Sequence, residues 1–370
     1  MNDLHGIVYA FRSPEHLGEL VGHRTCAAIP VCGRYRAIDF SLSMLSCAGV
    51  RGVGVIMQRD YQSLIDHVGS GKAWDLSRLR GGLHLLPPHG LPGALDGDYR
   101  GCMEALYAVS SYIREVPERH IALLNGGMVA NLDLEAAFRA HIDTGADVTA
   151  LCRARCSGGE HHELVTDAAG KCERLLCGRR TPGGGLELLE SCIIKKDVLL
   201  RLVGDCAAQG LWHFHRDALQ CLVKGGGDVR AFVCDAYARD ISGVREYMAI
   251  NMDMLEFENR ARLFPASRPV RTNGRADVST CYGSHAVSRG CLVADGCYIE
   301  GDVENCVIFR GVRIGEKAML RNCVVMQDCV IGAQAILKNV IADKEVAVTP
   351  YTVLTGSRNL PLVIPRGETV

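Results

Sequence analysis

The sequence lacks any hydrophobic run long enough to cross a membrane, because no stretch approaches about 18 consecutive apolar residues. Its first residues, Met1–Phe11, also lack the basic segment followed by a long apolar stretch that marks a secretory signal. These two absences predict a protein of the cytoplasm.

An excess of positive charge is also missing. The 41 lysine and arginine residues are balanced by 42 aspartate and glutamate residues, and the formal net charge is −1. This balance offers no basic face for nucleic acid or for an anionic membrane surface, and it favours small molecules or neutral proteins as partners. With 370 residues, of which 48% are hydrophobic, the chain fits two globular domains.

None of the 18 cysteines belongs to a CxxC pair, and none has a histidine at the spacing of a zinc site. We therefore expect no metal site in this chain. In a reducing cytoplasm the cysteines are expected to act as small buried hydrophobic residues. His84, His161, His162 and His213 have no acidic partner at a readable spacing, and we expect them in solvated or core positions.

The last quarter of the chain contains aliphatic residues that return every six positions. Two runs show this spacing: Val287, Val293 and Ile299, and then Val312, Ala318, Val324, Val330, Ile336, Ala342 and Val348. The period suits neither a helix nor a single strand, but it fits a triangular coil in which each hexad is one strand and one corner. The repeat predicts a hexapeptide parallel β-helix with these residues on its axis, and a β-sandwich is the alternative.

Other residues of the coil follow the same spacing. Cys291 and Cys297 lie six residues apart, as do Cys323 and Cys329, so each pair is expected to stack on one wall. The two aliphatic runs are offset by one residue near Asn305–Cys306, where we expect a bulge or loop that shapes a subunit interface. Because the end turns of such a coil stay open, it predicts a platform for another domain or subunit.

Upstream of the coil, short apolar strands alternate with helical patterns. Strands are expected over 6–11, 52–57, 121–125, 146–151 and 230–238, and helices over 41–48, 61–68, 103–115, 134–144 and 247–263. This alternation predicts an α/β domain with a doubly wound, mostly parallel sheet that binds ligands at the carboxyl ends of its strands. Turn signals predict hairpins within 156–188.

These patterns give three expected regions. The α/β domain is expected over 1–262, a linker rich in proline and arginine over 263–280, and the β-helix over 281–370.

Several blocks resemble the sugar-nucleotide pyrophosphorylases, most closely the glucose-1-phosphate adenylyltransferases, also called ADP-glucose pyrophosphorylases. The blocks are GRYRAIDFSLS at 33–43, GSGKAWDLSR at 69–78, and shorter matches at 85–88, 99–107, 239–240 and 249–255. The resemblance implies a Rossmann-like nucleotidyltransferase domain followed by a left-handed parallel β-helix. Active members of this family make ADP-glucose and pyrophosphate from ATP and glucose 1-phosphate.

Four catalytic parts of the family are missing here. The phosphate loop of the form GGxGxRL corresponds to residues 11–20, which lack paired glycines, include a proline and carry two glutamates. Cys26 stands where active members have a lysine, and Gly127 stands where they have the aspartate that holds the catalytic Mg²⁺. The sugar-phosphate segment Phe-Val-Glu-Lys-Pro has no clear counterpart at 172–177.

A few positions of the family's site are retained. Asp240 matches the second metal carboxylate and is the residual catalytic candidate, although an ion pair with Arg239 would also explain it. Asp133, the next carboxylate downstream of the lost one, is too far along the chain to replace it. Tyr99 and Gly101 match the nucleotide pocket, and a packed role would explain Tyr99 as well.

Three arginines lie beside the altered loop. Arg24 and Arg36 match basic positions of the family's effector cleft, which recognises sugar phosphates or AMP, and Arg34 lies between them. A guanidinium group suits phosphate because its planar fork binds two oxygens at once. An ion pair between Arg36 and Asp39 is the competing interpretation.

The combined departures resemble the non-catalytic subunit of bacterial ADP-glucose pyrophosphorylase. This resemblance implies a regulatory chain without a cofactor of its own, assembled with a catalytic subunit that holds Mg²⁺ in a hetero-oligomer, expected to be a tetramer. An active nucleotidyltransferase with a rebuilt metal site is the alternative. Acyl transfer, another activity of hexapeptide coils, needs a histidine at the coil surface, where only His285 lies close.

Overall fold

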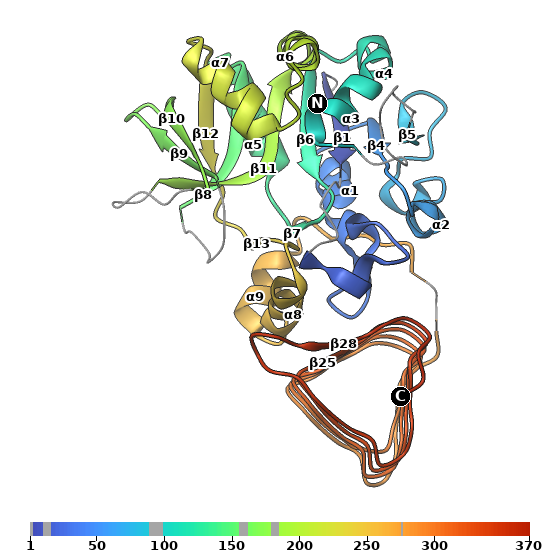
Figure 1. The fold of residues 1–370 in the computed structure, drawn as a ribbon. Coiled ribbons are helices and arrows are strands. Elements are labelled where there is room, and N and C mark those ends of the chain that lie inside the picture. Colours follow the sequence, from blue (N-terminus) through green and yellow to red (C-terminus); the bar gives the residue numbers. More distant parts are fainter. Residues whose placement is uncertain (1–2, 10–15, 89–98, 155–161, 179–184, 275–276) are drawn as a thin grey trace. The chain divides into compact units, whose positions relative to one another are not determined.

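The structure, a computed structural model, describes residues 3–9, 16–88, 99–154, 162–178, 185–274 and 277–370. The chain forms two compact units (Figure 1). Unit 1 comprises Met1–Phe11, Phe40–Ala238 and Ser267–Arg271, and unit 2 comprises Arg12–Asp39, Arg239–Ala266 and Thr272–Val370. The domain boundaries expected from the sequence, at 262 and 280, stay a prediction.

Unit 1 is built on a nine-stranded sheet. Its elements are β1 (Leu4–Tyr9), α1 (Ala37–Cys47, which begins in the preceding segment), β4 (Gly52–Ile56), α2 (Gln62–Val68), η4 (Lys72–Trp74), β5 (Gly82–Leu86), α3 (Cys102–Ala108), α4 (Ser110–Glu115), β6 (His120–Asn125), β7 (Met128–Ala130), α5 (Leu134–Thr144), β8 (Val148–Arg153), β9 (His162–Thr166), β10 (Cys172–Cys177), β11 (Leu186–Lys195), α6 (Lys196–Gln209), the π-helix η5 (Phe214–Leu219), α7 (Gln220–Lys224), β12 (Val229–Val233) and β13 (Ala238–Asp240, which ends in the next segment).

The centre of this sheet is parallel. Strands β5, β4, β1 and β6 are parallel neighbours in that order, and β12 runs parallel to β8. Strand β11 lies antiparallel between β6 and β8, and β9 and β10 form an antiparallel hairpin beside it. The predicted mostly parallel sheet and the hairpins are confirmed. The helix expected over 103–115 is instead two helices that meet at Val109.

Helices cover both faces of the parallel strands. A Cβ atom on Gly6 of β1 would lie 2.8 Å from Leu45 of α1, whereas one on Gly54 of β4 would lie 2.8 Å from Tyr112 of α4. Gly54 pairs with Ile7, the residue after Gly6, so the two glycines face opposite sides of the sheet. Helices on both faces make the sheet doubly wound, as predicted.

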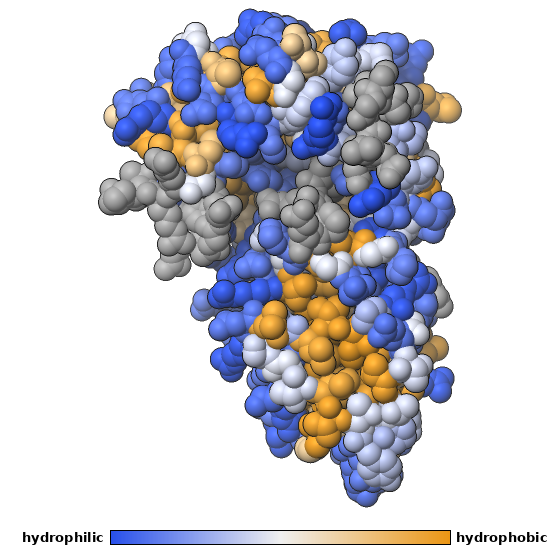
Figure 2. Space-filling view, viewed as in Figure 1, coloured by the Kyte–Doolittle hydropathy of each residue, from blue (hydrophilic) through white to orange (hydrophobic). Residues whose placement is uncertain are grey.

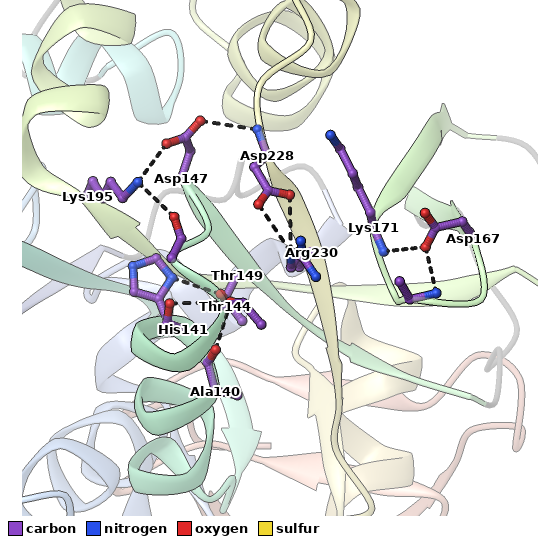
Figure 3. Close-up of polar contacts among 12 residues, drawn as sticks. Ala140, His141, Thr144, Asp147, Thr149, Asp167, Lys171, Lys195, Asp228 and Arg230 are labelled. Carbon is purple, nitrogen blue, oxygen red and sulfur yellow. Dashed lines mark hydrogen bonds and ion pairs between the residues drawn. The ribbon is translucent and has the colours of Figure 1, made fainter.

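A carboxylate joins three strands at one end of the sheet (Figure 3). Asp147 precedes β8 and accepts hydrogen bonds from Lys195 Nζ, at the end of β11, over 3.0 Å and from the backbone N–H of Asp228, before β12, over 3.1 Å. Nearby, His141 of α5 hydrogen-bonds with Thr149 of β8 over 2.8 Å. These contacts hold β8 between its neighbours. They lie at the amino ends of the parallel strands and leave the carboxyl end of β6 uninvolved.

Unit 2 combines a small N-terminal segment, two helices and the coil. The segment contains η2 (Gly18–Val21), η3 (Cys26–Ala28), β2 (Pro30–Val31) and β3 (Tyr35–Arg36), and the helices are α8 (Val244–Asp253) and α9 (Phe257–Leu263). The single helix expected over 247–263 is thus two. Tyr247 of α8 donates a hydrogen bond to the carbonyl of Pro30 over 2.8 Å, and Asn251 accepts one from the Cys32 N–H over 2.9 Å.

The coil is a left-handed hexapeptide β-helix with three walls. The first wall is β14 (Cys281–Tyr282), β17 (Tyr298–Ile299), β20 (Arg313–Ile314), β23 (Val330–Ile331) and β26 (Ala347–Val348); the second is β15 (Val287–Arg289), β18 (Asp302–Glu304), β21 (Met319–Arg321), β24 (Ile336–Lys338) and β27 (Val353–Thr355); the third is β16 (Leu292–Val293), β19 (Val307–Ile308), β22 (Val324–Val325), β25 (Val340–Ala342) and β28 (Leu362–Ile364). Parallel pairing within each wall confirms the prediction from the sixfold repeat.

The repeat is shorter than the six-residue pattern implies. Equivalent residues such as Cys306 and Cys323 are 17 positions apart, because one corner of each coil is shorter than the other two. Asn305, Asn322 and Asn339 hold this corner with φ near +50°. The bulge predicted at Asn305–Cys306 is therefore wrong: this corner recurs from coil to coil.

Because the repeat is 17 residues rather than 18, only some of the residues predicted on the axis lie there. Val312, Ala318, Ala342 and Val348 lie in the apolar core of the coil, as predicted. Val330 is 47% exposed and Ile336 half-buried, while Ile331 and Leu337 next to them are buried in that core. A strict period of six slips by one position in each coil, so Val330 and Ile336 leave the axis, and a second slip returns Ala342 and Val348 to it.

Cysteines do stack in the coil, but in different pairs from those predicted. Residues six apart lie on successive walls, whereas residues one coil apart share a wall. Cys291, Cys306 and Cys323 form such a stack, in which the backbone N–H of each cysteine lies 3.4 Å from the sulfur of the one before it. The expectation that Cys291 stacks on Cys297 is wrong for this reason.

The final coil departs from the regular pattern. Strand β28 follows β27 after a longer corner, and Ile341 pairs with Val363. The last residues also pair with the first wall, since the Val370 N–H donates to the Ala347 carbonyl over 2.9 Å and Thr369 bridges Ala347. The outer side of β26 is therefore covered by the chain's own C-terminal residues.

Within the ranges that the structure describes, no helix combines the length and the apolar character needed to span a bilayer.

Replacing Asp147 with asparagine is expected to lower the free energy of unfolding by about 1–2 kcal/mol, because the charge-assisted bond from Lys195 is lost. Partial burial opposes ionisation of Asp147, but the hydrogen bonds from Lys195 and the Asp228 N–H lower its pKa. Its contribution is therefore present above the unfolded-state pKa of about 3.9 and disappears as the pH falls through the lower folded-state pKa.

Urea unfolding as a function of pH checks this expectation, with Asp143→Asn as the control because Asp143 is exposed on the adjacent helix α5. The two variants should differ at neutral pH and converge in acid. Equal stability of both variants at neutral pH would contradict the role given to Asp147.

Candidate functional site

The carboxyl end of β6 forms a tightly bonded turn in unit 1. Asn125 ends the strand, and its side-chain oxygen accepts the N–H of Gly127 over 2.8 Å. Its carbonyl accepts a hydrogen bond from Ser41 over 3.0 Å, and the Gly126 N–H donates to the Tyr9 carbonyl at the end of β1. The turn thus lies where ligands bind in doubly wound sheets, and its shape is set by hydrogen bonds within the protein.

Residues at this turn do not fit the catalytic magnesium ion of active adenylyltransferases. Gly127 is buried in the turn and has no side-chain oxygen, whereas Mg²⁺ is held by carboxylates and other hard oxygen ligands. Asp133 is already used as the N-cap of α5, where it accepts the Ala136 N–H over 2.9 Å, and it lies 3.6 Å from Arg268. No reaction step through magnesium is therefore assigned to these residues.

The two predicted pocket residues lie at the start of α3. Tyr99 is 9% exposed and belongs to the apolar core of unit 1. Gly101 is required by a close approach, because a Cβ atom there would lie 2.3 Å from the carbonyl oxygen of Trp212. The guanidinium of Arg100 stacks 4.1 Å from the Trp212 ring centroid and pairs with Glu104 over 2.5 Å. These contacts give both residues a packing role.

A group of metal-ligating side chains, missed by the sequence analysis, lies beside this turn. One ligand atom each from His162, Glu190 and His215 lie within 4.8 Å of one another. Glu190 contacts the turn directly, because its carboxylate accepts the side-chain N–H of Asn125 over 3.3 Å. No readable spacing links His162 to an acidic partner, because the three residues are distant in sequence and meet only in the folded chain.

Two other predicted positions lie in unit 2. Cys26 is buried in η3, and its sulfur is 3.9 Å from the carbonyl of Ile241. Asp240, the residue before Ile241, is half-buried at the end of β13. Its neighbour Arg239 pairs with Asp253 of α8 over 3.1 Å. The structure therefore brings Cys26 close to the retained carboxylate position, but a thiol offers no positive charge for a phosphate.

The predicted effector arginines have different environments. Arg24 is 4% exposed and forms a buried ion pair with Asp343, which is 1% exposed. Arg36 is half-buried, and its backbone N–H donates to Asp39 over 2.9 Å. Arg34 is exposed. Of the three, Arg24 is thus fixed inside unit 2 by a charge from the β-helix.

A lysine next to this ion pair completes a basic cluster, which we define as Arg24, Arg36, Lys344 and Arg366. Burial lowers the pKa of Lys344 to about 7, and the positive charges of Arg36 and Arg24 act in the same direction. Arg366 also acts on Lys344 and is anchored to Glu345 over 2.9 Å. The cluster offers an excess of cations around one buried carboxylate, which suits a phosphate group.

Sequence reasoning missed Asp343, Lys344 and Arg366. The available signal was a pair of charged residues, Asp343–Lys344, directly after Ala342 in the apolar repeat. Charges at that position need partners from outside the coil, and Arg24 is one of them.

Comparisons with known proteins agree with this architecture. Residues 17–158 match the family described as nucleotidyl transferase, and residues 278–358 match the family described as GlmU-like, C-terminal hexapeptide. The chain is 30% identical over 99% of its length to "Glycogen biosynthesis protein GlgD" of Bacillus subtilis (strain 168), covering 96% of that protein. The corresponding protein of Geobacillus stearothermophilus is 32% identical over 99% of this chain and 97% of its own length.

A further relative carries the name of the enzyme itself. "Glucose-1-phosphate adenylyltransferase" of Desulfitobacterium hafniense (strain Y51) is 29% identical over 82% of this chain and 77% of its own length.

The doubly wound sheet is followed along the chain by a hexapeptide β-helix. Together with the family match, this combination defines a nucleotidyltransferase of the sugar-nucleotide type. The sequence identities to the two GlgD proteins extend over nearly the full length of the chain and indicate a particular family within this class. The chain belongs to the ADP-glucose pyrophosphorylase family, among its GlgD-like members.

Replacing Arg24 with methionine is expected to lower the free energy of unfolding by about 3–5 kcal/mol, because Asp343 would stay buried without its cation. Adding Asp343→Asn should recover much of this loss, since the uncompensated charge is then removed as well. A double-mutant cycle by urea unfolding measures both effects. Arg34→Met, at an exposed position, is the control and should change stability by no more than about 0.5 kcal/mol.

Proposed function

We propose that the chain is a regulatory, catalytically deficient subunit of ADP-glucose pyrophosphorylase that modulates a catalytic partner. The role in glycogen biosynthesis rests on full-length relatives that carry that name. The observation that supports catalytic deficiency is Gly127, which occupies a buried turn at the end of β6 and supplies no oxygen for a metal. The proposed catalytic partner holds the Mg²⁺ and makes ADP-glucose and pyrophosphate from ATP and glucose 1-phosphate.

The β-helix offers surfaces suited to a partner subunit. Several apolar side chains on its walls are 40–63% exposed: Met319, Val330 and Val353. Apolar residues also gather over the triangular end of the coil that faces the viewer in Figure 2. Exposed apolar surface of this kind marks association sites, and it supports assembly with a partner. We propose that the assembly is a hetero-oligomer of the cytoplasm, and we expect it to be a tetramer.

The basic cluster is the proposed effector site. Arg36 and Lys344 lie half-buried beside the Arg24–Asp343 ion pair, so that their charges are only partly screened by water. A sugar phosphate or a nucleotide phosphate bound there would neutralise the excess positive charge. Because the cluster joins the N-terminal segment to the β-helix within unit 2, an anion there would change how firmly these parts of the subunit are held together.

The isolated chain is expected to form little or no ADP-glucose from ATP and glucose 1-phosphate with Mg²⁺. Co-expression with a catalytic subunit should yield a mixed oligomer with altered kinetics, measured by size-exclusion chromatography and by the rate of pyrophosphate release. Robust metal-dependent pyrophosphate exchange by the chain alone, abolished by Asp240→Ala, would show that it is an active enzyme with a rebuilt metal site.

Within the same experiment, Val330→Glu is expected to weaken the mixed oligomer, because a charge replaces an apolar side chain that is 47% exposed. Lys317→Glu is the control, since Lys317 is exposed and already charged. If both variants assemble equally well, the wall that carries Val330 is not part of the interface.

Anion binding to the basic cluster is expected to depend on pH. Since the folded-state pKa of Lys344 is about 7, its side chain is largely neutral above that pH, and an anion can bind tightly only if Lys344 takes up a proton. The affinity for inorganic sulfate, whose charge is constant in this range, should therefore rise as the pH falls from about 9 to about 6.

Calorimetric titration of the full chain with sulfate in buffers of different ionisation enthalpy measures this uptake. Lys344→Met should remove the pH dependence and weaken binding by about tenfold. Lys338→Met, an exposed control in β24, should leave both unchanged. Binding that is independent of pH in the unmodified chain would exclude Lys344 from the site.

A further inference from the structure

Three side chains with metal-binding atoms converge in unit 1 from separate elements. His162 begins β9, Glu190 lies in β11 and His215 lies in the π-helix η5. Their ligand atoms lie within 4.8 Å of one another, with His215 buried and the other two half-buried. We propose that His162, Glu190 and His215 bind a transition-metal ion, for which zinc is the best match. This site goes beyond the regulatory function proposed above and does not depend on it.

The backbone places Glu190 in this site at a conformational cost. Glu190 has a φ of +47°, which is unfavourable for a residue with a side chain, and it lies where the pairing of β11 with β8 shifts register between Leu188 and Cys192. Such a bulge turns a side chain away from the regular alternation of the strand. The Glu190 carboxylate is therefore directed toward the histidines by a local irregularity, which regular pairing would not produce.

Neighbouring groups hold Glu190 in place. The hydroxyl of Tyr9 donates to the backbone carbonyl of Glu190 over 2.6 Å, and the side-chain N–H of Asn125 donates to its carboxylate over 3.3 Å. Ligands of structural and catalytic metals are commonly oriented by such outer contacts.

The two histidines are also suitably arranged. Their ring centroids are 5.0 Å apart with a tilt of 39° between the ring planes, so both rings border the same small volume. His215 belongs to a π-helical turn, and such turns often occur at functional sites. Two imidazoles and one carboxylate form the ligand set of many zinc sites that leave a fourth position open to water or to an oxygen of a bound molecule.

The ligand chemistry distinguishes this site from the magnesium site of the family. Magnesium prefers oxygen ligands in an octahedron, whereas imidazole nitrogens suit zinc, copper, nickel and iron. In a tetrahedral zinc site the ligand atoms are about 3.4 Å apart, and the ligand atoms of the present side chains lie within 4.8 Å of one another. No spacing in the sequence indicates this site, because its ligands come from three separate elements.

The test uses the full chain without a polyhistidine tag, stripped with a chelator and titrated with Zn²⁺ in competition with a chromogenic chelator. One tightly bound zinc per chain is expected. Glu190→Gln and His215→Gln should each weaken this binding by about 100-fold, and Asn125→Ala, which removes an outer contact, by about tenfold. His213→Ala is the matched control, because His213 is exposed and adjacent to the site in sequence; its affinity should be unchanged.

Two further measurements keep the outcome decisive. If Glu190→Gln or His215→Gln fails to fold, His162→Gln provides the same test at a half-buried position. The Co²⁺ complex should lack the charge-transfer bands of thiolate ligands, since the 18 cysteines of the chain are the competing ligands. Zinc affinity that is equal in all variants, or cobalt spectra with thiolate bands, would overturn the assignment.

Discussion

The buried ion pair between Arg24 and Asp343 is the constraint on which the organisation of unit 2 depends. It connects two residues that are both less than 5% exposed and far apart in sequence, one from the N-terminal segment and one from the β-helix. A buried charge is stable only with its partner, so this ion pair holds the described segment 16–39 against the coil. The bonds of Tyr247 to Pro30 and of Asn251 to Cys32 add helix α8 to the same assembly. Burial in this arrangement lowers the pKa of Lys344 to about 7, and the positive charges of Arg36 and Arg24 act in the same direction.

In unit 1, hydrogen bonds within the protein determine the shape of the turn after β6. The turn after β6 is held by backbone and side-chain hydrogen bonds from Tyr9, Ser41 and Asn125, and none of them requires a metal. Gly101 keeps the close contact with Trp212 that any larger residue would prevent. The sheet and this turn therefore keep their shape without an oxygen ligand at Gly127, in line with the proposed function. Near this turn lie Glu190, His162 and His215, whose nitrogen and oxygen ligands suit zinc better than magnesium.

Periodicity and family resemblance were sufficient to predict the fold, because both depend on local sequence. The sixfold repeat identified the β-helix, and Val312 and Ala318 were placed correctly on its axis. The repeat could not reveal that Asn305, Asn322 and Asn339 shorten one corner of each coil, so Val330 was placed inside although it faces solvent. The candidate sites were less predictable for a related reason. Burial lowers the pKa of Lys344, with smaller effects from Arg36 and Arg24, and Glu190 meets its histidines at a bulge. Neither arrangement produces a spacing that can be recognised along the chain.

The irregular last coil has a consequence for assembly. A regular β-helix ends in three open strands, onto which a second copy could add its own coil in register and so begin a fibre. Here the corner between β27 and β28 is longer than the others, and residues 369–370 already pair with β26. A copy added at this end would have to match the longer corner between β27 and β28 as well as the pairing of Val370 with Ala347. The irregular last coil therefore disfavours stacking of copies in register on all three walls.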